Sequence, residues 1–156
     1  MDKYIDEEKD IYVALNKCYG GFGLSPKATE LYLKKIGKEA HFYVQTAYKF
    51  KEGYEEYTKL SIEEATTYLG GACIYTLTKD LGKTFRGPIP NEHHWYETFY
   101  EDRSNKELIE TITELGEEES SARLASISLV RIPKDMEYEI DDYDGIETLR
   151  ENHRSW

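Results

Sequence analysis

The chain has few of the features that place a protein in a compartment or a membrane. Cys18 and Cys73 are its only cysteines, too few and too far apart for a disulfide framework, so each is expected to be a small buried thiol. No apolar run approaches the roughly 20 residues that span a bilayer. The acidic first residues lack the apolar core of a secretory signal. We therefore expect a cytoplasmic protein that does not bind membranes.

The sequence also lacks the common catalytic and phosphate-binding signatures. It has no Gly-Lys-Ser/Thr of a P-loop, no six-residue G-x-G-x-x-G, no G-x-S-x-G and no H-E-x-x-H. His93 and His94 are adjacent, so their side chains point in different directions and do not form a ready metal pair. We expect no metal and no cofactor. A non-enzymatic role is favoured, with a nucleotide hydrolase or transferase using His93 and His94 as an alternative.

Positive charge is scarce as well. Twenty lysines and arginines face 31 aspartates and glutamates, for a net charge of −11. Such a surface repels phosphate backbones and argues against direct nucleic-acid binding. The simplest role of this negatively charged surface is to keep the protein soluble. A second role is the recognition of a basic protein by an acidic face, for which the candidates are Glu137, Glu139, Asp141, Asp142 and Asp144.

Tyrosine is abundant where aliphatic residues are few. Hydrophobic residues make up only 39% of the chain, yet it has 14 tyrosines, two tryptophans and five phenylalanines. Tyrosine buries a large ring and keeps a polar end, so a core can form from fewer aliphatic residues. With 156 residues, the chain is expected to form a single domain, 1–156.

Periodic apolar patterns run along most of the chain and predict an α+β fold with a largely antiparallel sheet and about three helices. Alternation predicts strands at 11–16, 41–51, 54–60, 72–78, 124–132 and 136–140. Helical spacing and capping boxes predict helices at 26–36, after Ser61 and after Ser104. The remaining expectations are a long loop at 83–94, a solvated acidic connection at 117–121 and a short helix at 146–156.

The most informative segment is Asn16-Lys17-Cys18-Tyr19-Gly20-Gly21-Phe22-Gly23-Leu24-Ser25-Pro26. It predicts a strand, a glycine-rich turn and a helix whose first turn holds the proline. Backbone N–H groups in such a turn can bind an anion. The candidate ligand-binding residues here are Tyr19, Gly20, Gly21 and Phe22. The alternative is a tight corner that binds nothing.

Three arginines complete the candidate ligand site. Arg86 and Arg103 flank the aromatic stretch 95–100, and Arg154 lies near the C-terminus. An arginine beside aromatic rings can stack on a base or hold a phosphate with its fork of donors. It can equally pair with a nearby carboxylate.

Two groups of residues resemble a known family. One is Asn16-Lys17-Cys18-Tyr19-Gly20-Gly21-Phe22-Gly23-Leu24-Ser25. The other comprises Arg103, Ile132-Pro133, Glu137-Tyr138-Glu139-Ile140, Tyr143-Asp144-Gly145 and His153-Arg154-Ser155-Trp156. Together they resemble a family of small uncharacterised proteins of bacteriophages and prophages. The resemblance covers about 11–26 and 100–156, and it implies that 40–98 is a variable elaboration.

The resemblance implies a setting rather than a mechanism. Small phage proteins often oppose host defences, so it suggests a cytoplasmic anti-defence protein that sequesters a nucleotide-type host immune signal. An acidic inhibitor of a host protein is the alternative, and a homo-oligomer is left open. The family usually has Asp-Pro where this chain has Asn105-Lys106. Because the two groups of residues occur together, we expect the glycine corner and the segment 153–156 to meet in space.

Overall fold

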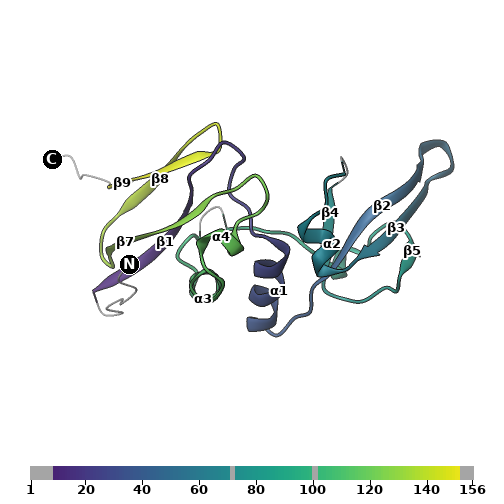
Figure 1. The fold of residues 1–156 in the computed structure, drawn as a ribbon, viewed down its shortest axis with the longest axis horizontal. Coiled ribbons are helices and arrows are strands. Elements are labelled where there is room, and N and C mark those ends of the chain that lie inside the picture. Colours follow the sequence, from purple (N-terminus) through teal and green to yellow (C-terminus); the bar gives the residue numbers. More distant parts are fainter. Residues whose placement is uncertain (1–8, 71–72, 100–101, 152–156) are drawn as a thin grey trace. The chain divides into compact units, whose positions relative to one another are not determined.

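The computed structural model describes residues 9–70, 73–99 and 102–151, and it divides into two compact units (Figure 1). Unit 1 is built from Met1–Ala28 and Thr98–Trp156, and unit 2 is Thr29–Glu97. Every strand pairing is antiparallel, and the described part of the chain has four α-helices, two of them ten residues long. The predicted α+β class is confirmed.

Unit 1 is centred on an antiparallel ribbon of β1 (Asp10–Asn16) and β7 (Ile127–Pro133). The β8 (Tyr138–Tyr143) and β9 (Ile146–Glu151) hairpin packs across it, with partly buried side chains such as Ile140 and Leu149 against the ribbon's core. That core consists of Val13, Leu15 and Ile132. Alternation turns Ala14 to the opposite face of the ribbon, where it is also fully buried.

Helices cover other parts of the ribbon. Helix α3 (Lys106–Leu115) contacts β1 and buries Leu108, Thr111 and Ile112. Helix α4 (Glu117–Ser120) contacts β7. The first residues of helix α1 (Pro26–Lys35) are counted with unit 1 and the others with unit 2.

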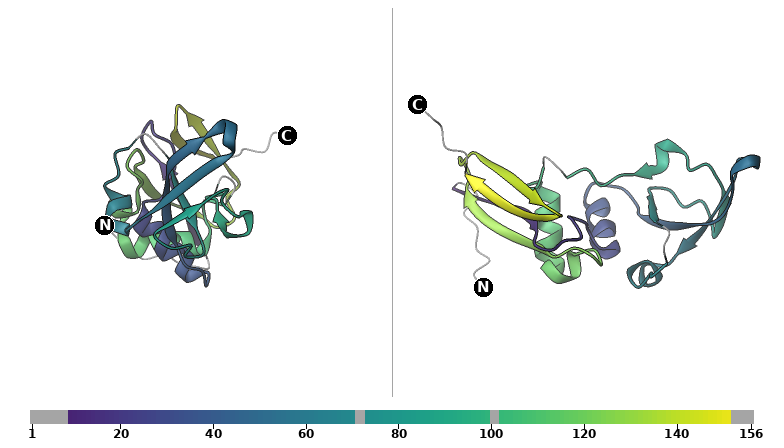
Figure 2. Two further views of the ribbon diagram at one scale, coloured as in Figure 1. Left: turned by 90° about the vertical axis from the view of Figure 1, so that its right-hand side faces the viewer. Right: turned by 90° about the horizontal axis from the view of Figure 1, so that it is seen from above.

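Unit 2 is a five-stranded sheet in the order β5-β3-β2-β4-β6, seen from two further sides in Figure 2. Its elements are β2 (His41–Lys49), η1 (Phe50–Glu52), β3 (Tyr54–Leu60), α2 (Ile62–Thr66), β4 (Ile74–Leu77), β5 (Thr84–Arg86), η2 (Asn91–His93) and β6 (His94–Trp95). Tyr43, Tyr57 and Leu77 form its core, and the ring of Phe85 stacks on Tyr57 at 5.0 Å. Aromatic rings thus supply much of the buried area, as the composition suggests.

Local signals predicted several elements correctly. The strand at 11–16, the helix beginning at Pro26 and the hairpin of 41–60 are all present. The capping box at Ser61 is confirmed by two reciprocal hydrogen bonds. The Glu64 N–H donates to Ser61 Oγ at 3.1 Å, and the Ser61 N–H donates to Glu64 Oε1 at 3.0 Å.

Four expectations were wrong. The segment after Gly145 is strand β9 rather than a helix, because Asp144 and Gly145 have φ values of 50° and 91° and reverse the chain into a hairpin. The segment 117–121 includes a short helix with Ser120 buried, and the segment 83–94 contains strand β5. Asn105, not Ser104, is the N-cap of α3, accepting a hydrogen bond from the Leu108 N–H at 3.0 Å.

In the described part of the chain, no helix has the length and apolar character needed to cross a bilayer.

Candidate functional site

A buried ion pair lies at the centre of unit 1. The guanidinium of Arg103 forms a two-pronged contact with the carboxylate of Glu147, with Nη1–Oε1 and Nη2–Oε2 distances of 2.5 and 2.8 Å. The two residues are only 4% and 3% exposed. Arg103 also donates from Nε to the Phe99 carbonyl at 2.7 Å and from Nη1 to the Ala14 carbonyl at 3.3 Å. These bonds compensate the desolvation of both charges.

Asn16, which is fully buried, links the ion pair to the loops around it. Its backbone N–H donates to Glu147 Oε1 at 2.8 Å, and its Nδ2 donates to the carbonyls of Gly145 at 2.6 Å and Cys18 at 2.5 Å. Its Oδ1 accepts the Ser126 N–H at 2.8 Å. One side chain therefore joins the glycine corner, the loop before β7 and the β8–β9 turn.

The glycines of the corner allow these loops to approach closely. A Cβ at Gly20 would lie 1.6 Å from the backbone oxygen of Leu124. A Cβ at Gly145 would lie 2.5 Å from the Tyr19 oxygen and 2.6 Å from the Gly21 nitrogen. Gly21 itself has a φ of 83°, a conformation that glycine adopts readily. Packing between loops accounts for Gly20 and Gly145, and the backbone conformation accounts for Gly21.

The glycine corner, the loop before β7 and the β8–β9 turn lie side by side at one end of unit 1 (Figure 1). Three large hydrophobic residues of these segments are exposed by 70%, 66% and 76%: Tyr19 in the corner, Leu124 in the loop before β7, and Tyr143 at the end of β8. We call these three residues the loop-tip surface. Large exposed aromatic and aliphatic side chains on rigidly held loops are typical anchors of protein interfaces.

The candidate residues from the sequence are only partly brought together. Of the corner residues Tyr19, Gly20, Gly21 and Phe22, Phe22 lies against the ion pair, with its ring centroid 3.9 Å from Arg103 Cζ. Arg86 belongs to unit 2, where its Cζ lies 4.9 Å from the centroid of the Tyr54 ring. Arg154 and the rest of 153–156 lie outside the described residues. The C-terminal residues seen against the corner are those of the β8–β9 turn.

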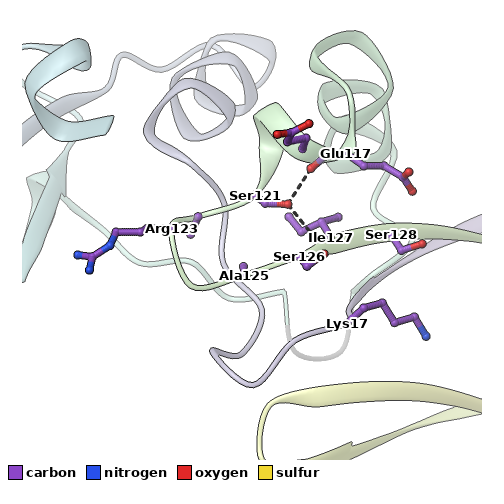
Figure 3. Close-up of a pocket in the computed structure, with 10 residues that line it drawn as sticks. Lys17, Glu117, Ser121, Arg123, Ala125, Ser126, Ile127 and Ser128 are labelled. Atoms are coloured by element: carbon purple, nitrogen blue, oxygen red, sulfur yellow. Dashed lines mark hydrogen bonds between the residues drawn. The ribbon is translucent and has the colours of Figure 1, made fainter. Parts of the chain in front are cut away.

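A shallow hollow of about 730 Å³ is lined by the loop before β7 (Figure 3). The same loop carries Leu124 of the loop-tip surface. Glu117 and Lys17 flank the hollow on opposite sides of Ser126 and Ser128, and Arg123 points away from them. Glu117 Oε2 is held in place by the Leu129 N–H at 2.6 Å. The hollow is polar and carries both signs of charge.

The two cysteines differ from their expected burial. Cys18 is half-buried, and its thiol donates to the Leu124 carbonyl at 3.0 Å. Cys73 is exposed. Both are free thiols, and they lie outside the strands, Cys18 in the glycine corner and Cys73 just before β4.

The histidines of the alternative enzyme lie in unit 2. Burial lowers the pKa of His94, which favours the neutral ring, and the ring packs against Tyr75 and Tyr96. His93 Nε2 lies 3.9 Å from a Glu92 carboxylate oxygen. Within residues 9–70, 73–99 and 102–151, no group of three or more His, Cys, Asp or Glu is placed to hold a metal ion.

The acidic face predicted on β8 is partly neutralised. Arg150 on β9 contacts the carboxylates of both Glu139 and Asp141, with 3.1 Å between its Nε and Asp141 Oδ2. Asp142 accepts the Gly145 N–H at 2.8 Å and so stabilises the turn. Even so, unit 1 holds 21 of the chain's 31 acidic residues and 11 of its 20 basic ones, a net charge of −10.

Several residues of the site had no sequence signal. Leu124 lies in a stretch expected to be strand, and Glu147 lies in the expected tail helix. Asn16 and Tyr143 belong to the two segments of the family resemblance, which is the one indication that drew attention to them. Asn16 joins the loops of the site through hydrogen bonds to Glu147 and Ser126, which lie more than 100 positions away in the sequence.

Comparison with known proteins adds no relative: no protein-family model, no curated protein and no solved structure matches this chain.

Proposed function

We propose that this chain is a non-enzymatic binding protein that recognises a basic protein through the loop-tip surface. The observation that carries the proposal is the exposure of Tyr19, Leu124 and Tyr143 on three loops joined by one buried polar network. Exposed apolar side chains are ordinary when scattered, whereas three on touching loop tips indicate an interface. In the phage setting that the resemblance implies, the partner is a host protein and binding inhibits it.

Rigidity and charge support this proposal. The Arg103–Glu147 pair and Asn16 hold the loops in one arrangement, so little conformational entropy is lost when a partner binds. The net charge of −10 on unit 1 attracts basic surfaces and speeds association with them. A partner with an apolar anchor beside lysine or arginine satisfies both features. We place the protein in the cytoplasm, where free thiols such as Cys18 and Cys73 persist.

Selection from a library of random 12-residue peptides displayed on phage tests the proposal. We expect enriched peptides that combine an aromatic or aliphatic residue with lysine or arginine. Their binding should fall at least tenfold in a Tyr19→Ala/Tyr143→Ala variant and at high salt. Tyr48→Ala is the matched control, because Tyr48 is an exposed tyrosine of unit 2. No enrichment, or binding that the double variant retains, would refute the proposal.

A nucleotide-type ligand is the second candidate, favoured by the hollow beside the surface. Lys17, Ser126 and Ser128 line it and are suited to phosphate oxygens. Thermal unfolding with cyclic dinucleotides, cyclic trinucleotides and cyclic ADP-ribose isomers tests this reading. A ligand at 100 times its Kd should add about 2.7 kcal/mol of stability. Recovery of intact nucleotide after denaturation would distinguish sequestration from turnover.

A further inference from the structure

The two strands of the unit 1 ribbon differ in what covers their outer edges. On β1, the Ala14 N–H donates to the Arg103 carbonyl at 2.8 Å. Two positions later, the Asn16 N–H donates to Glu147 Oε1 at 2.8 Å. Arg103 and Glu147 form the buried ion pair of unit 1. The outer edge of β1 is therefore closed by residues that cannot leave it without breaking that pair.

The outer edge of β7 is covered by side chains instead. The register places Ile127 and Leu129 opposite the two outward-facing residues of β1, so their own N–H and carbonyl groups also point away from the ribbon. The Ile127 N–H donates to Ser121 Oγ at 2.8 Å, and the Leu129 N–H donates to Glu117 Oε2 at 2.6 Å. Two side-chain oxygens thus stand where the backbone carbonyls of a neighbouring strand would lie.

The two covering side chains come from one short segment, α4 and the residue after it. Ser121 Oγ also donates to the Glu117 carbonyl at 2.7 Å, which joins the two residues (Figure 3). Both are half-buried, and both line the hollow together with Ile127 and Ser128 of β7. We call Glu117 and Ser121 the edge cover. The hollow therefore lies along the edge that these two side chains occupy.

We infer that β7 accepts an extended segment of a basic protein partner as an added strand, and that the edge cover competes with this segment in the free protein. The inference rests on the function proposed above and gives its partner a binding mode. The outward N–H and carbonyl groups of an edge strand pair with the backbone of any extended chain. Carbonyls of the segment replace Ser121 Oγ and Glu117 Oε2, so both N–H groups of β7 keep an acceptor.

Position and charge indicate which segment the edge takes. Leu124 of the loop-tip surface precedes β7 on the same loop, so an added strand continues the surface that the partner already contacts. Within the hollow, Lys17 faces the acidic residues Glu117 and Glu118, so the local charge is small and backbone hydrogen bonds supply the contacts. The net charge of −10 on unit 1 repels unit 1 of a second copy and attracts a segment rich in lysine or arginine.

Binding of a basic extended peptide, Lys-Val-Lys-Val-Lys-Val-Lys, tests the inference by the direction of a change. Glu117→Ala removes the internal competitor and should tighten binding about threefold or more, because more of the protein has an open edge. Glu118→Ala is the matched control, since it removes the same charge from the same hollow, and it should not tighten binding. Glu117→Gln keeps an oxygen acceptor and should bind no more tightly than the wild type. If the edge were only an acidic surface, Glu117→Ala would bind more weakly, and that result would overturn the inference.

Backbone hydrogen bonding is measured separately on the wild-type protein. An analogue of the peptide that is N-methylated at every internal residue keeps its charge and side chains, and it should bind roughly tenfold more weakly because it donates no backbone hydrogen bond along its length. Hydrogen exchange of the Ile127 and Leu129 amides should slow when the unmodified peptide is added. Equal binding of the two peptides, or unchanged exchange at both amides, would overturn the inference.

Failure of this inference and failure of the proposed function give different results. Displayed peptides that depend on Tyr19 and Tyr143 but leave the Leu129 amide unchanged would remove the added strand and keep the loop-tip surface. Binding at the β7 edge without any dependence on Tyr19 or Tyr143 would support the added strand and refute the loop-tip surface. Circular dichroism confirms the fold of each variant.

Discussion

Removing the carboxylate of Glu147 should destabilise unit 1 more than any surface substitution. In Glu147→Ala, the guanidinium of Arg103 stays buried without its counter-ion, and the Asn16 N–H loses its acceptor. Breaking one side of a buried ion pair costs about 3–5 kcal/mol. That is a large share of the roughly 5–15 kcal/mol that stabilises a whole domain.

Urea unfolding of the variant measures this loss. With a slope of about 2 kcal/mol per molar urea, the midpoint should fall by about 1.5–2.5 M. The extent to which a thiol reagent labels Cys18 at each urea concentration reports on the unfolding of unit 1 alone, provided that Cys73 of unit 2 is replaced by serine. Arg150→Met is the control: it removes two solvent-exposed ion pairs and should leave the midpoint nearly unchanged.

A double variant separates the loss of the ion pair from the burial of a single unpaired charge. Arg103→Met/Glu147→Met removes both charges and fills the site with flexible apolar side chains. It should recover much of the stability lost in Glu147→Ala, because the attraction within a buried ion pair offsets little more than the cost of removing its two charges from water. A midpoint shift below about 0.5 M in Glu147→Ala, or a double variant no more stable than the single one, would refute the reasoning.

Three further predictions concern the corner, a helix cap and pH. Gly20→Ala places a Cβ 1.6 Å from the backbone oxygen of Leu124. It should destabilise unit 1 more than Gly21→Ala, for which the left-handed φ alone costs about 1–2 kcal/mol. The thermal unfolding midpoints of the two variants test this. Asn105→Ala should lose about 1 kcal/mol of cap stabilisation while Ser104→Ala loses almost none, measured by urea midpoints. Burial, and then a hydrogen bond to a neighbouring carboxylate, raises the pKa of Tyr57 to about 12 from 10.0. Folded protein then holds this proton longer than unfolded protein, so stability is complete below pH 10 and falls as pH rises toward 12. Tyr57→Phe should reduce that fall, and tyrosinate absorbance at alkaline pH follows the titration.

The sequence predicted elements wherever a local signal was sufficient. The alternation of β1 and β2, the proline at the start of α1 and the Ser61 capping box depend on residues within a few positions of one another. The sequence predicts a short helix in the segment after Gly145. It is a strand because the Asp144-Gly145 turn pairs it with β8, and pairing is a property of two segments.

The candidate site likewise combines features that the sequence indicates with contacts that only the fold shows. The glycine corner was visible in the sequence as an unusual turn, and the fold gives its glycines a packing role against Leu124 and the β8–β9 turn. Arg103 was considered for phosphates or for a carboxylate partner, and the structure pairs it with Glu147. Nothing near either residue in sequence identifies the other, since 44 positions separate them.

By itself, the sequence determined that this is an acidic, tyrosine-rich α+β protein with antiparallel strands and a glycine corner before its first helix. These properties follow from composition and from periodicity over short windows. Only the tertiary structure decided that three distant loops meet over a buried ion pair and expose Tyr19, Leu124 and Tyr143 together. The physical reason is that burial and exposure depend on which segments come into contact, and those contacts join residues more than 100 positions apart.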